Sequence, residues 1–249
     1  MTAASVDLNA DLGEGGPADR ALLDLVTSAS VACGFHAGGP RLMLDTADEA
    51  ARRGVAVGAH PSYDDREGFG RRALSVTPDD LYAELAYQIG AMSGAASAAG
   101  TRVTYIKAHG ALYNRAAVDP ATAEVVVRAA AAFGLPLLCP SGSEMAATAA
   151  VGGVHAYCEV FADRAYTPEG TLVPRSSPGA VLADEDEVVA RSLRLVLEGT
   201  VVTVDGREVA VAADSICIHG DTPGAVALAR RVRRELAAAG VALRPFSAA

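Results

Sequence analysis

Lys107 is the only lysine in a chain of 249 residues that carries 21 basic side chains, so every other basic residue is an arginine. A lone lysine in such a chain indicates a requirement that arginine cannot meet. The amine is compact and can lose its proton when buried, whereas the guanidinium is wide and permanently charged. Lys107 could instead be a buried cation that a core carboxylate neutralises, and the two interpretations are compatible.

Four of the five histidines lie at or just after the end of a short apolar run: His36, His60, His109 and His219. Acidic residues accompany them, namely Asp7, Asp11, Glu14 and Glu159. A single histidine is more often a hydrogen-bonded core residue than a catalyst. The repeated placement nevertheless predicts one site in which imidazoles and carboxylates transfer protons. Such a mixture can also hold a divalent metal, although no local HxxxH pair signals one.

Arginines follow one of these acidic segments. Arg164 and Arg175 come shortly after Glu159 and Asp163. A planar guanidinium suits bidentate capture of a substrate carboxylate or phosphate, although Asp163 and Arg164 could simply pair with each other at the surface. The chain has no GxxxxGK[ST] or GxSxG motif, so the sequence predicts neither a nucleotide-binding P-loop nor a serine-hydrolase elbow.

Short β-rich runs alternate with helical patterns along the whole chain. The expected strands are Ser5–Ala10, Ser28–Cys33, Val55–His60, Val103–Ala108, Leu135–Cys139, Val154–Val160 and Ser215–His219. The expected helices are Arg41–Arg53, Pro78–Ala99, Pro120–Phe133, Ser143–Ala150, Asp184–Glu198 and Pro223–Ala239. This alternation predicts a parallel sheet, either open and doubly wound or closed into a barrel. We expect one domain over residues 1–249, with a β-hairpin inserted near 200–211.

Polar and apolar residues alternate within several of these strands. In the first, Asp7, Asn9 and Asp11 share one face, and leucine and alanine residues occupy the other. Lys107 and His109 share a face in the fourth strand. Because helices would cover the outside of a barrel, the polar faces must look into it or its mouth. Catalytic groups of α/β barrels gather at the carboxyl ends of the strands, so the sequence predicts a site at that rim.

Composition and charge restrict the class of protein. The mean hydropathy of +0.23 favours a large core, and the absence of Trp with few Phe and Tyr residues predicts that this core is aliphatic. The formal net charge of -9 makes nucleic acid an improbable partner. The chain shows no signal-peptide pattern and no membrane-spanning run, so we expect a soluble, cytoplasmic protein. The four cysteines form no CxxC pair and are expected to be buried, reduced thiols, with a nucleophilic Cys158 as the alternative.

Seven blocks of the chain are rich in polar residues: VDLNADLGEG (6–15), SASVACGFHAGGP (28–40), VGAHPSYDDREGFGRR (57–72), YIKAHGALYN (105–114), EVFADRAY (159–166), LVPRSSPGAVL (172–182) and ICIHGD (216–221). In consistent order from residue 6 to about residue 240, the chain resembles the LamB/YcsF family, whose members are A subunits of bacterial 5-oxoprolinase. One departure is Ala108, where the family often has a proline. That change affects backbone stiffness beside the site and none of its functional groups.

The resemblance implies an irregular seven-stranded parallel β/α barrel, similar to polysaccharide deacetylases and related glycoside hydrolases. It also implies ATP-dependent conversion of 5-oxoproline to L-glutamate, together with partner B and C subunits. ATP would be a co-substrate bound with those partners, since the chain carries no nucleotide motif. The deacetylase likeness allows a divalent metal, for which Asp11, His36 and His60 are the candidate ligands. A homo-oligomer is also allowed.

The resemblance also selects site residues. The expected catalytic residues are Lys107, Asp11, His109, Glu159 and His219. The expected substrate-binding residues are Asp7, Asn9, Glu14, His36, His60, Asp163, Arg164, Arg175 and Asp221. Lys107 would stabilise a developing oxyanion, an acid–imidazole pair would transfer protons, and Arg164 or Arg175 would hold the substrate carboxylate. Alternatives are a metal-dependent hydrolase of another small amide, a non-catalytic subunit that presents substrate, and a carbohydrate-binding barrel.

Overall fold

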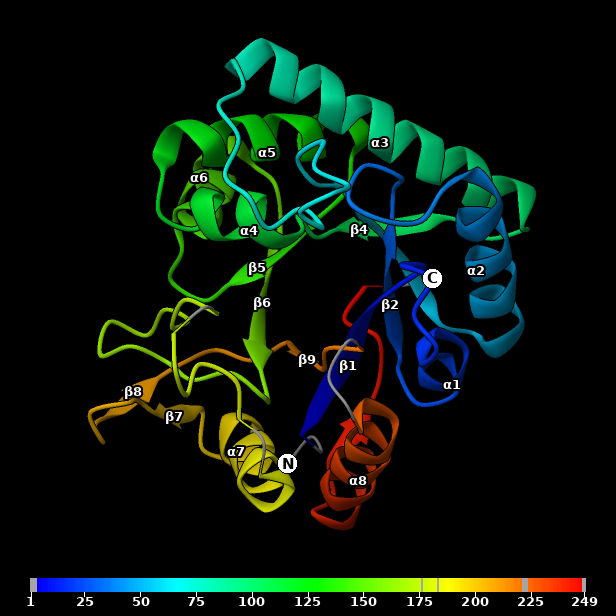
Figure 1. The fold of residues 1–249 in the computed structure, drawn as a ribbon. Helices are drawn as coiled ribbons and strands as arrows, with labels where there is room; N and C mark the ends of the chain where they lie inside the picture. Colours follow the sequence, from blue (N-terminus) through cyan, green and yellow to red (C-terminus); the bar gives the residue numbers. More distant parts are fainter. Residues whose placement is uncertain (1–3, 176, 183, 221–223, 248–249) are drawn as a thin grey trace.

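Seven parallel strands close into a barrel in a computed structural model that describes residues 4–175, 177–182, 184–220 and 224–247 (Figure 1). The strands are β1 (Ser5–Leu12), β2 (Ser28–Ala32), β3 (Ala56–His60), β4 (Val103–Ile106), β5 (Leu137–Pro140), β6 (Ala156–Phe161) and β9 (Ser215–Cys217). They pair in that order, and β9 pairs back onto β1. The short strand β10 (Ala242–Leu243) runs parallel to the start of β1. The closed barrel confirms one of the two predicted sheet arrangements and excludes the open one.

Helices surround the barrel, as Figure 1 shows. They are α1 (Asp19–Leu23), α2 (Pro40–Arg53), α3 (Pro78–Ala98), α4 (Gly110–Ala116), α5 (Pro120–Phe133), α6 (Glu144–Gly152), α7 (Glu185–Leu197) and α8 (Ala225–Ala238). The sequence predicts all of these except α1 and α4. Those two are five and seven residues long, too short to show a helical period of apolar residues. None of the described helices is long and apolar enough to cross a membrane.

Helices α3 and α5 each begin at a proline that follows a capping residue. The Thr77 hydroxyl accepts a hydrogen bond from the Asp80 backbone N–H, and the Asp119 carboxylate accepts one from Thr122. Thr222 and Pro223, a third pair of this kind in the sequence, lie outside the described residues, and α8 begins later, at Ala225. Strands β7 (Thr200–Val202) and β8 (Glu208–Ala210) pair antiparallel around a turn in which Gly206 has a φ of 82°.

The hydrophobic core lies between the strands and the surrounding helices. Leu8, Ala10 and Leu12 of β1 face outward into it and are fully buried. Alanine, valine and leucine dominate the core, as the shortage of aromatic residues predicts. Because the outer face of each strand is anchored in this layer, the alternation of side chains turns the polar residues inward at fixed heights along the barrel axis.

Aromatic rings fill the amino-terminal end of the barrel. Tyr105 points inward from β4 and occupies the space beside Gly58, where an added Cβ would lie 2.2 Å from its ring. Its hydroxyl lies 3.0 Å from the Ser30 hydroxyl. Phe246, which follows β10, packs its ring centroid 4.8 Å from that of Tyr105 and 4.7 Å from that of Tyr157. We call these three aromatic residues the floor of the barrel; the polar residues lie above it.

Candidate active site

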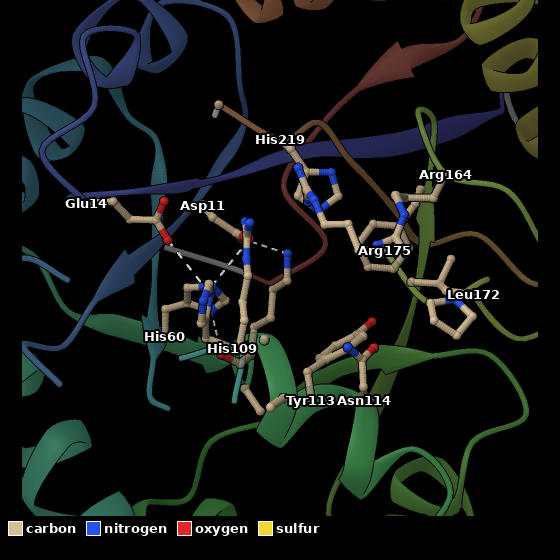
Figure 2. A pocket seen from close by; sticks show the side chains of 18 residues that line it. Asp11, Glu14, His60, His109, Tyr113, Asn114, Arg164, Leu172, Arg175 and His219 are labelled. Atoms are coloured by element: carbon tan, nitrogen blue, oxygen red, sulfur yellow. Dashed lines mark hydrogen bonds and ion pairs between the residues drawn. The ribbon is translucent and has the colours of Figure 1, made fainter. Parts of the chain in front are cut away.

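A cavity of about 520 Å³ opens at the carboxyl ends of the strands, where the polar inner faces end. Its functional lining consists of Asp11, Glu14, His60, Arg71, Lys107, His109, Tyr113, Asn114, Arg164, Arg175 and His219, most of which Figure 2 labels. The histidines that end or follow β2, β3, β4 and β9 all lie at this rim, as the sequence predicts. His155, the fifth histidine, precedes β6 and is exposed. The barrel therefore gathers one amine, several imidazoles and several carboxylates around one opening.

Lys107 lies at the bottom of the cavity with its ammonium group between carboxylates. Its Nζ atom is 2.8 Å from Asp11 Oδ1, 2.7 Å from Glu159 Oε1 and 3.2 Å from Asn9 Oδ1. Burial alone would lower the pKa of Lys107, but the charges of Asp11 and Glu159 raise it well above its usual value. Burial likewise opposes ionisation of Asp11, yet His60 and Lys107 lower the pKa of that carboxyl well below its usual range. Lys107 is a fixed positive charge that faces the cavity.

Glu159 is held in place by donors on both of its oxygens. Asn9 Nδ2 donates to Oε1 at 3.0 Å, beside Lys107, and the Tyr113 hydroxyl donates to Oε2 at 2.7 Å. The Glu159 side chain is buried behind the cavity wall. With both oxygens engaged, this carboxylate fixes the position of Lys107 and is poorly arranged to accept a proton from a reactant.

Asp7 lies deeper than any group that could touch a substrate. Its carboxylate accepts hydrogen bonds from the hydroxyls of Thr27, Ser28 and Ser215. Burial raises its pKa to about 6, against the lowering effect of these hydrogen bonds. Ser215 in turn accepts a hydrogen bond from Asn9 Nδ2 at 2.7 Å. Asp7 and Asn9, which the sequence assigns to substrate binding, therefore form a buried support below Lys107 and do not line the cavity.

His60 and His109 meet at one side of the cavity, with His60 Nε2 2.9 Å from His109 Nδ1. The other nitrogen of each ring contacts a backbone carbonyl oxygen. His60 Nδ1 is 2.7 Å from the Lys107 oxygen, and His109 Nε2 is 2.9 Å from the Phe69 oxygen. His60 Nε2 also lies 3.3 Å from Asp11 Oδ2. Burial and the neighbouring His60 lower the pKa of His109 to about 3, so its ring is neutral near pH 7.

His36 and Glu14 complete this cluster. The His36 ring stacks flat on that of His109, with 3.8 Å between centroids, and its Nε2 is 3.2 Å from Glu14 Oε1. Burial and the neighbouring His109 lower the pKa of His36, which favours the neutral ring. Its Nδ1 has no hydrogen-bond partner among the described residues. His36 lies behind the cavity wall, whereas Glu14, His60 and His109 reach the cavity.

His219 and Asp163 form an imidazole–carboxylate pair on another wall. His219 Nδ1 is 3.0 Å from both oxygens of the buried Asp163 side chain. Burial alone would raise the pKa of Asp163, but the interaction with His219 lowers it. The ring of Phe161 stacks against His219 at 5.6 Å. Since Asp163 accepts the proton on Nδ1, the other ring nitrogen of His219 is left as an acceptor, the arrangement of a general base.

Two arginines line the cavity across from the histidine cluster, as Figure 2 shows. Arg164 donates from Nε to the Ala180 carbonyl at 3.2 Å and from a terminal nitrogen to the Val173 carbonyl at 2.6 Å. These backbone contacts fix the guanidinium plane, and burial followed by the charge of Arg175 lowers the pKa of Arg164. Arg164 does not pair with Asp163 in a surface ion pair, since Asp163 is buried against His219.

Two groups of side chains have donor atoms close enough to hold a metal among the described residues. One is Glu14, His36, His60 and His109, and the other is Asp11, Cys217 and His219. The candidate set predicted from the sequence, Asp11, His36 and His60, is thus divided between them, although His60 touches Asp11. Asp221 lies outside the described residues.

Sequence reasoning did not select Tyr113, Asn114 and Arg71, which all line the cavity. Tyr113 and Asn114 lie on the short helix α4, and Arg71 lies in the loop after β3. The blocks 57–72 and 105–114 contain them, so their polar composition was the available signal. Cys158, the alternative nucleophile, does not line the cavity, and burial raises the pKa of its thiol.

Comparisons with known proteins agree on one family. The chain is 55% identical over 249 residues to the 5-oxoprolinase A subunit of Paracidovorax citrulli, a match that covers 97% of this chain and 99% of that relative. It is 54% identical over 249 residues to the 5-oxoprolinase A subunit of Streptomyces coelicolor, covering 97% of this chain and 100% of that relative.

Solved structures give the same result for the fold. The lactam utilization protein from Thermus thermophilus superposes with a TM-score of 0.90 at 45% identity, covering 96% of this chain and 99% of that one. A family 4 carbohydrate esterase from Streptomyces lividans, with a TM-score of 0.55 at 14% identity and coverage of 99% and 97%, is similar in fold alone. The LamB/YcsF family model matches residues 6–249. This chain belongs to the LamB/YcsF family.

Proposed function

We propose that this chain is the A subunit of an ATP-dependent 5-oxoprolinase, which opens 5-oxo-L-proline to L-glutamate together with B and C subunits. Relatives that carry the name of the 5-oxoprolinase A subunit are 55% and 54% identical over nearly the whole chain. The four cysteines are free thiols, which supports a cytoplasmic location for the complex.

The arrangement of charge in the cavity carries this proposal. 5-Oxoproline is a five-membered lactam that bears one carboxylate. Arg164 and Arg175 line one wall and suit the carboxylate, whereas Lys107 and His219 present an ammonium group and an imidazole to the ring amide. A cavity of about 520 Å³ accommodates a small cyclic molecule of this kind.

The ring amide is a poor electrophile, and ATP would activate it. The lactam is resonance-stabilised and little strained, so its hydrolysis by water alone is slow and not strongly favourable. Phosphorylation of the amide oxygen would make the ring carbon a better electrophile. Because the sequence contains no P-loop, we assign ATP binding to the complex with the B and C subunits.

In the step assigned to this chain, a water oxygen bonds to the ring carbonyl carbon. His219 takes a proton from that water while Asp163 holds the opposite ring nitrogen. Lys107 stabilises the negative charge at the phosphorylated oxygen during this attack. The carbon–nitrogen bond then breaks, and the nitrogen receives both protons of the water, one of them through His219. The product of this step is the acyl phosphate of glutamate, and a second water cleaves it to L-glutamate and phosphate.

Glu159 and Asp11 support Lys107 in this scheme. Their carboxylates hold the ammonium group from two sides, at 2.7 and 2.8 Å. Among the proton-transfer candidates predicted from the sequence, we select His219. Its ring lines the cavity, and Asp163 engages only Nδ1, so that Nε2 can accept a proton. We therefore propose Glu159 as a positioning residue and His219 as the general base.

A turnover assay tests the proposal. The chain is purified alone and with the B and C subunits, and glutamate and ADP are measured with 5-oxoproline and ATP. We expect both products only in the complete mixture. Absence of glutamate from the complete mixture would contradict the proposal. Deacetylation of N-acetylated sugars by the chain alone would indicate a metal-dependent hydrolase of another amide, for which the Glu14, His60 and His109 cluster could supply the metal ligands. If variants of the cavity residues lose substrate binding and turnover in proportion, the chain only presents substrate to its partners.

A further inference from the structure

Two ring nitrogens face each other at the cavity edge, His60 Nε2 and His109 Nδ1. A carbonyl oxygen only accepts hydrogen bonds, so the Lys107 carbonyl requires the proton of a neutral His60 ring on Nδ1. The Phe69 carbonyl likewise requires the proton of a neutral His109 ring on Nε2. The remaining nitrogens, His60 Nε2 and His109 Nδ1, then carry lone pairs and lie only 2.9 Å apart. Such an approach is unfavourable unless a metal ion or an added proton lies between or beside them.

Two carboxylate oxygens lie close to these ring nitrogens. Glu14 Oε1 is 3.8 Å from His109 Nδ1, and Asp11 Oδ2 is 3.3 Å from His60 Nε2. The ammonium group of Lys107 is already engaged by Asp11 and Glu159. A proton shared between the two nitrogens would need no third group. Here the Glu14 oxygen also lies beside them, as a third metal ligand would. The donor atoms of Glu14, His60 and His109 lie within 4.8 Å of one another.

We propose that Glu14, His60 and His109 bind a divalent transition-metal ion of the zinc class. Two donors bonded to one zinc at about 2.0–2.1 Å with tetrahedral angles lie roughly 3.3 Å apart, close to the observed separations of 2.9 and 3.8 Å. Two imidazoles and one carboxylate form a three-ligand set, and all three residues line the cavity, which leaves a fourth position open toward it.

The groups behind these ligands match what a metal site requires. Each ligand histidine donates its other N–H to a backbone carbonyl, which fixes both tautomers. His36 Nε2 lies 3.2 Å from Glu14 Oε1 and orients that carboxylate from behind. An ion at this place supplies Lewis acidity to an oxygen that reaches it from the cavity. The inference goes beyond the proposed function, which assigns no role to a metal.

Metal binding by the complete purified chain tests the proposal without any substrate. After dialysis against a chelator, the chain is titrated with Zn²⁺ alone by calorimetry, and the visible absorption of added Co²⁺ is recorded. We expect one ion per chain and the absorption of a four-coordinate Co²⁺ site. His109→Gln and Glu14→Gln should each weaken binding at least about a hundredfold, beyond the 10–100-fold typical of groups behind the ligands.

His155→Gln is the matched control, because it removes an exposed histidine at the other end of the barrel. It should bind the ion as the unchanged chain does. Glu14→Gln preserves shape at a partly exposed residue, so it tests the site even if His109→Gln fails to fold, and thermal unfolding of each variant is recorded. Absence of binding to the unchanged chain, equal binding by the Glu14 variant, or loss of binding in the His155 variant would each overturn the proposal.

An imidazolium detected by nitrogen-15 NMR at His60 or His109, in a chain that binds no ion, would identify a shared proton instead and also overturn it. The binding assay contains neither ATP nor 5-oxoproline. A negative result in the binding assay therefore does not contradict the proposed oxoprolinase activity, and a negative turnover assay does not contradict the metal site.

Discussion

At the scale of single residues, Lys107 neutralises buried carboxylates and, in the proposed reaction, also stabilises charge on the substrate. Removing it leaves the buried carboxylates of Asp11 and Glu159 without their cation, which costs about 3–5 kcal/mol of stability. We therefore expect Lys107→Met to be strongly destabilised and Lys107→Met with Glu159→Gln to recover much of that loss. Urea unfolding measures the stability of both. The folded double variant should have no 5-oxoproline turnover in the complete complex, and near-normal turnover would remove Lys107 from the mechanism.

In the proposed reaction, proton transfer depends on His219. Since general-base catalysis contributes roughly 10²–10⁴-fold, His219→Asn should lower kcat by about that factor with little change in substrate affinity. Steady-state kinetics of the complete complex measure both quantities. His155→Asn makes the same substitution at an exposed histidine outside the cavity and should keep full activity. An equal fall in binding and in turnover for His219→Asn would point to a chain that only presents substrate.

Asp7 predicts a pH dependence of stability. Burial raises its pKa from 3.8 to about 6, so the folded chain binds this proton more tightly than the unfolded chain. The fold therefore loses stability as pH rises through this window, by roughly 3 kcal/mol for a shift of about two units. Asp7→Asn lacks the titration, so its unfolding free energy relative to the unchanged chain should rise between pH 4 and pH 7. Urea unfolding across that range checks this, with Asp79→Asn as an exposed control. A constant difference would contradict the assignment.

At the scale of elements, the loop after β3 sets the position of the histidine cluster. A terminal nitrogen of Arg66 donates to the carbonyls of Gly34 and Gly38 at 2.6 and 2.8 Å, which ties the loop to the segment after β2. Gly70, in the same loop, lies against the histidines. An added Cβ there would be 2.7 Å from His109 Cδ2. The segment 63–73 therefore forms part of the wall around the cavity, which its Arg71 side chain lines.

Gly70→Ala should therefore displace His109. The change also strains the backbone, because Gly70 has a φ of +66°. Gly100→Ala is the matched control, since its φ is +73° and nothing lies within 4 Å of the added Cβ. Both variants should lose about 1–2 kcal/mol of stability from the strain, and only Gly70→Ala should also lose activity, on the order of tenfold or more. Equal turnover by the two variants would contradict this role of the loop.

The elements also show what the sequence could and could not predict. Strand alternation predicted that Asp7 and Asp11 share the inner face of β1, and they do. Alternation carries no information on height, so it could not tell that Asp7 lies among buried hydroxyls while Asp11 reaches the cavity. Tyr113 was not selected because α4 is only seven residues long and shows no clear period. The proton positions on His60 and His109 depend on carbonyls that approach only in the folded chain.

At the scale of the whole molecule, the floor closes the barrel end opposite the site. Phe246 is half-buried between Tyr105 and Tyr157, so Phe246→Ala should cost about 1–3 kcal/mol, less than the 3–5 kcal/mol of a fully buried phenylalanine. Turnover at temperatures where the variant is folded should be unchanged, because the floor does not line the cavity. Val151→Ala, at a side chain of α6 that is 92% exposed, is the control and should change stability little. Loss of activity in the folded Phe246 variant would show that the floor also shapes the site.

The solitary lysine has a practical consequence for watching this molecule unfold. Reagents that acylate amines require an unprotonated nitrogen, and in the native barrel Lys107 is protonated and its side chain is only 3% exposed. Unfolding releases it as the chain's one lysine amine. Mass spectrometry after a brief pulse of reagent would thus read zero lysine adducts from each native copy and one from each unfolded copy. The labelled fraction gives the unfolded population directly, without any dye or engineered tag.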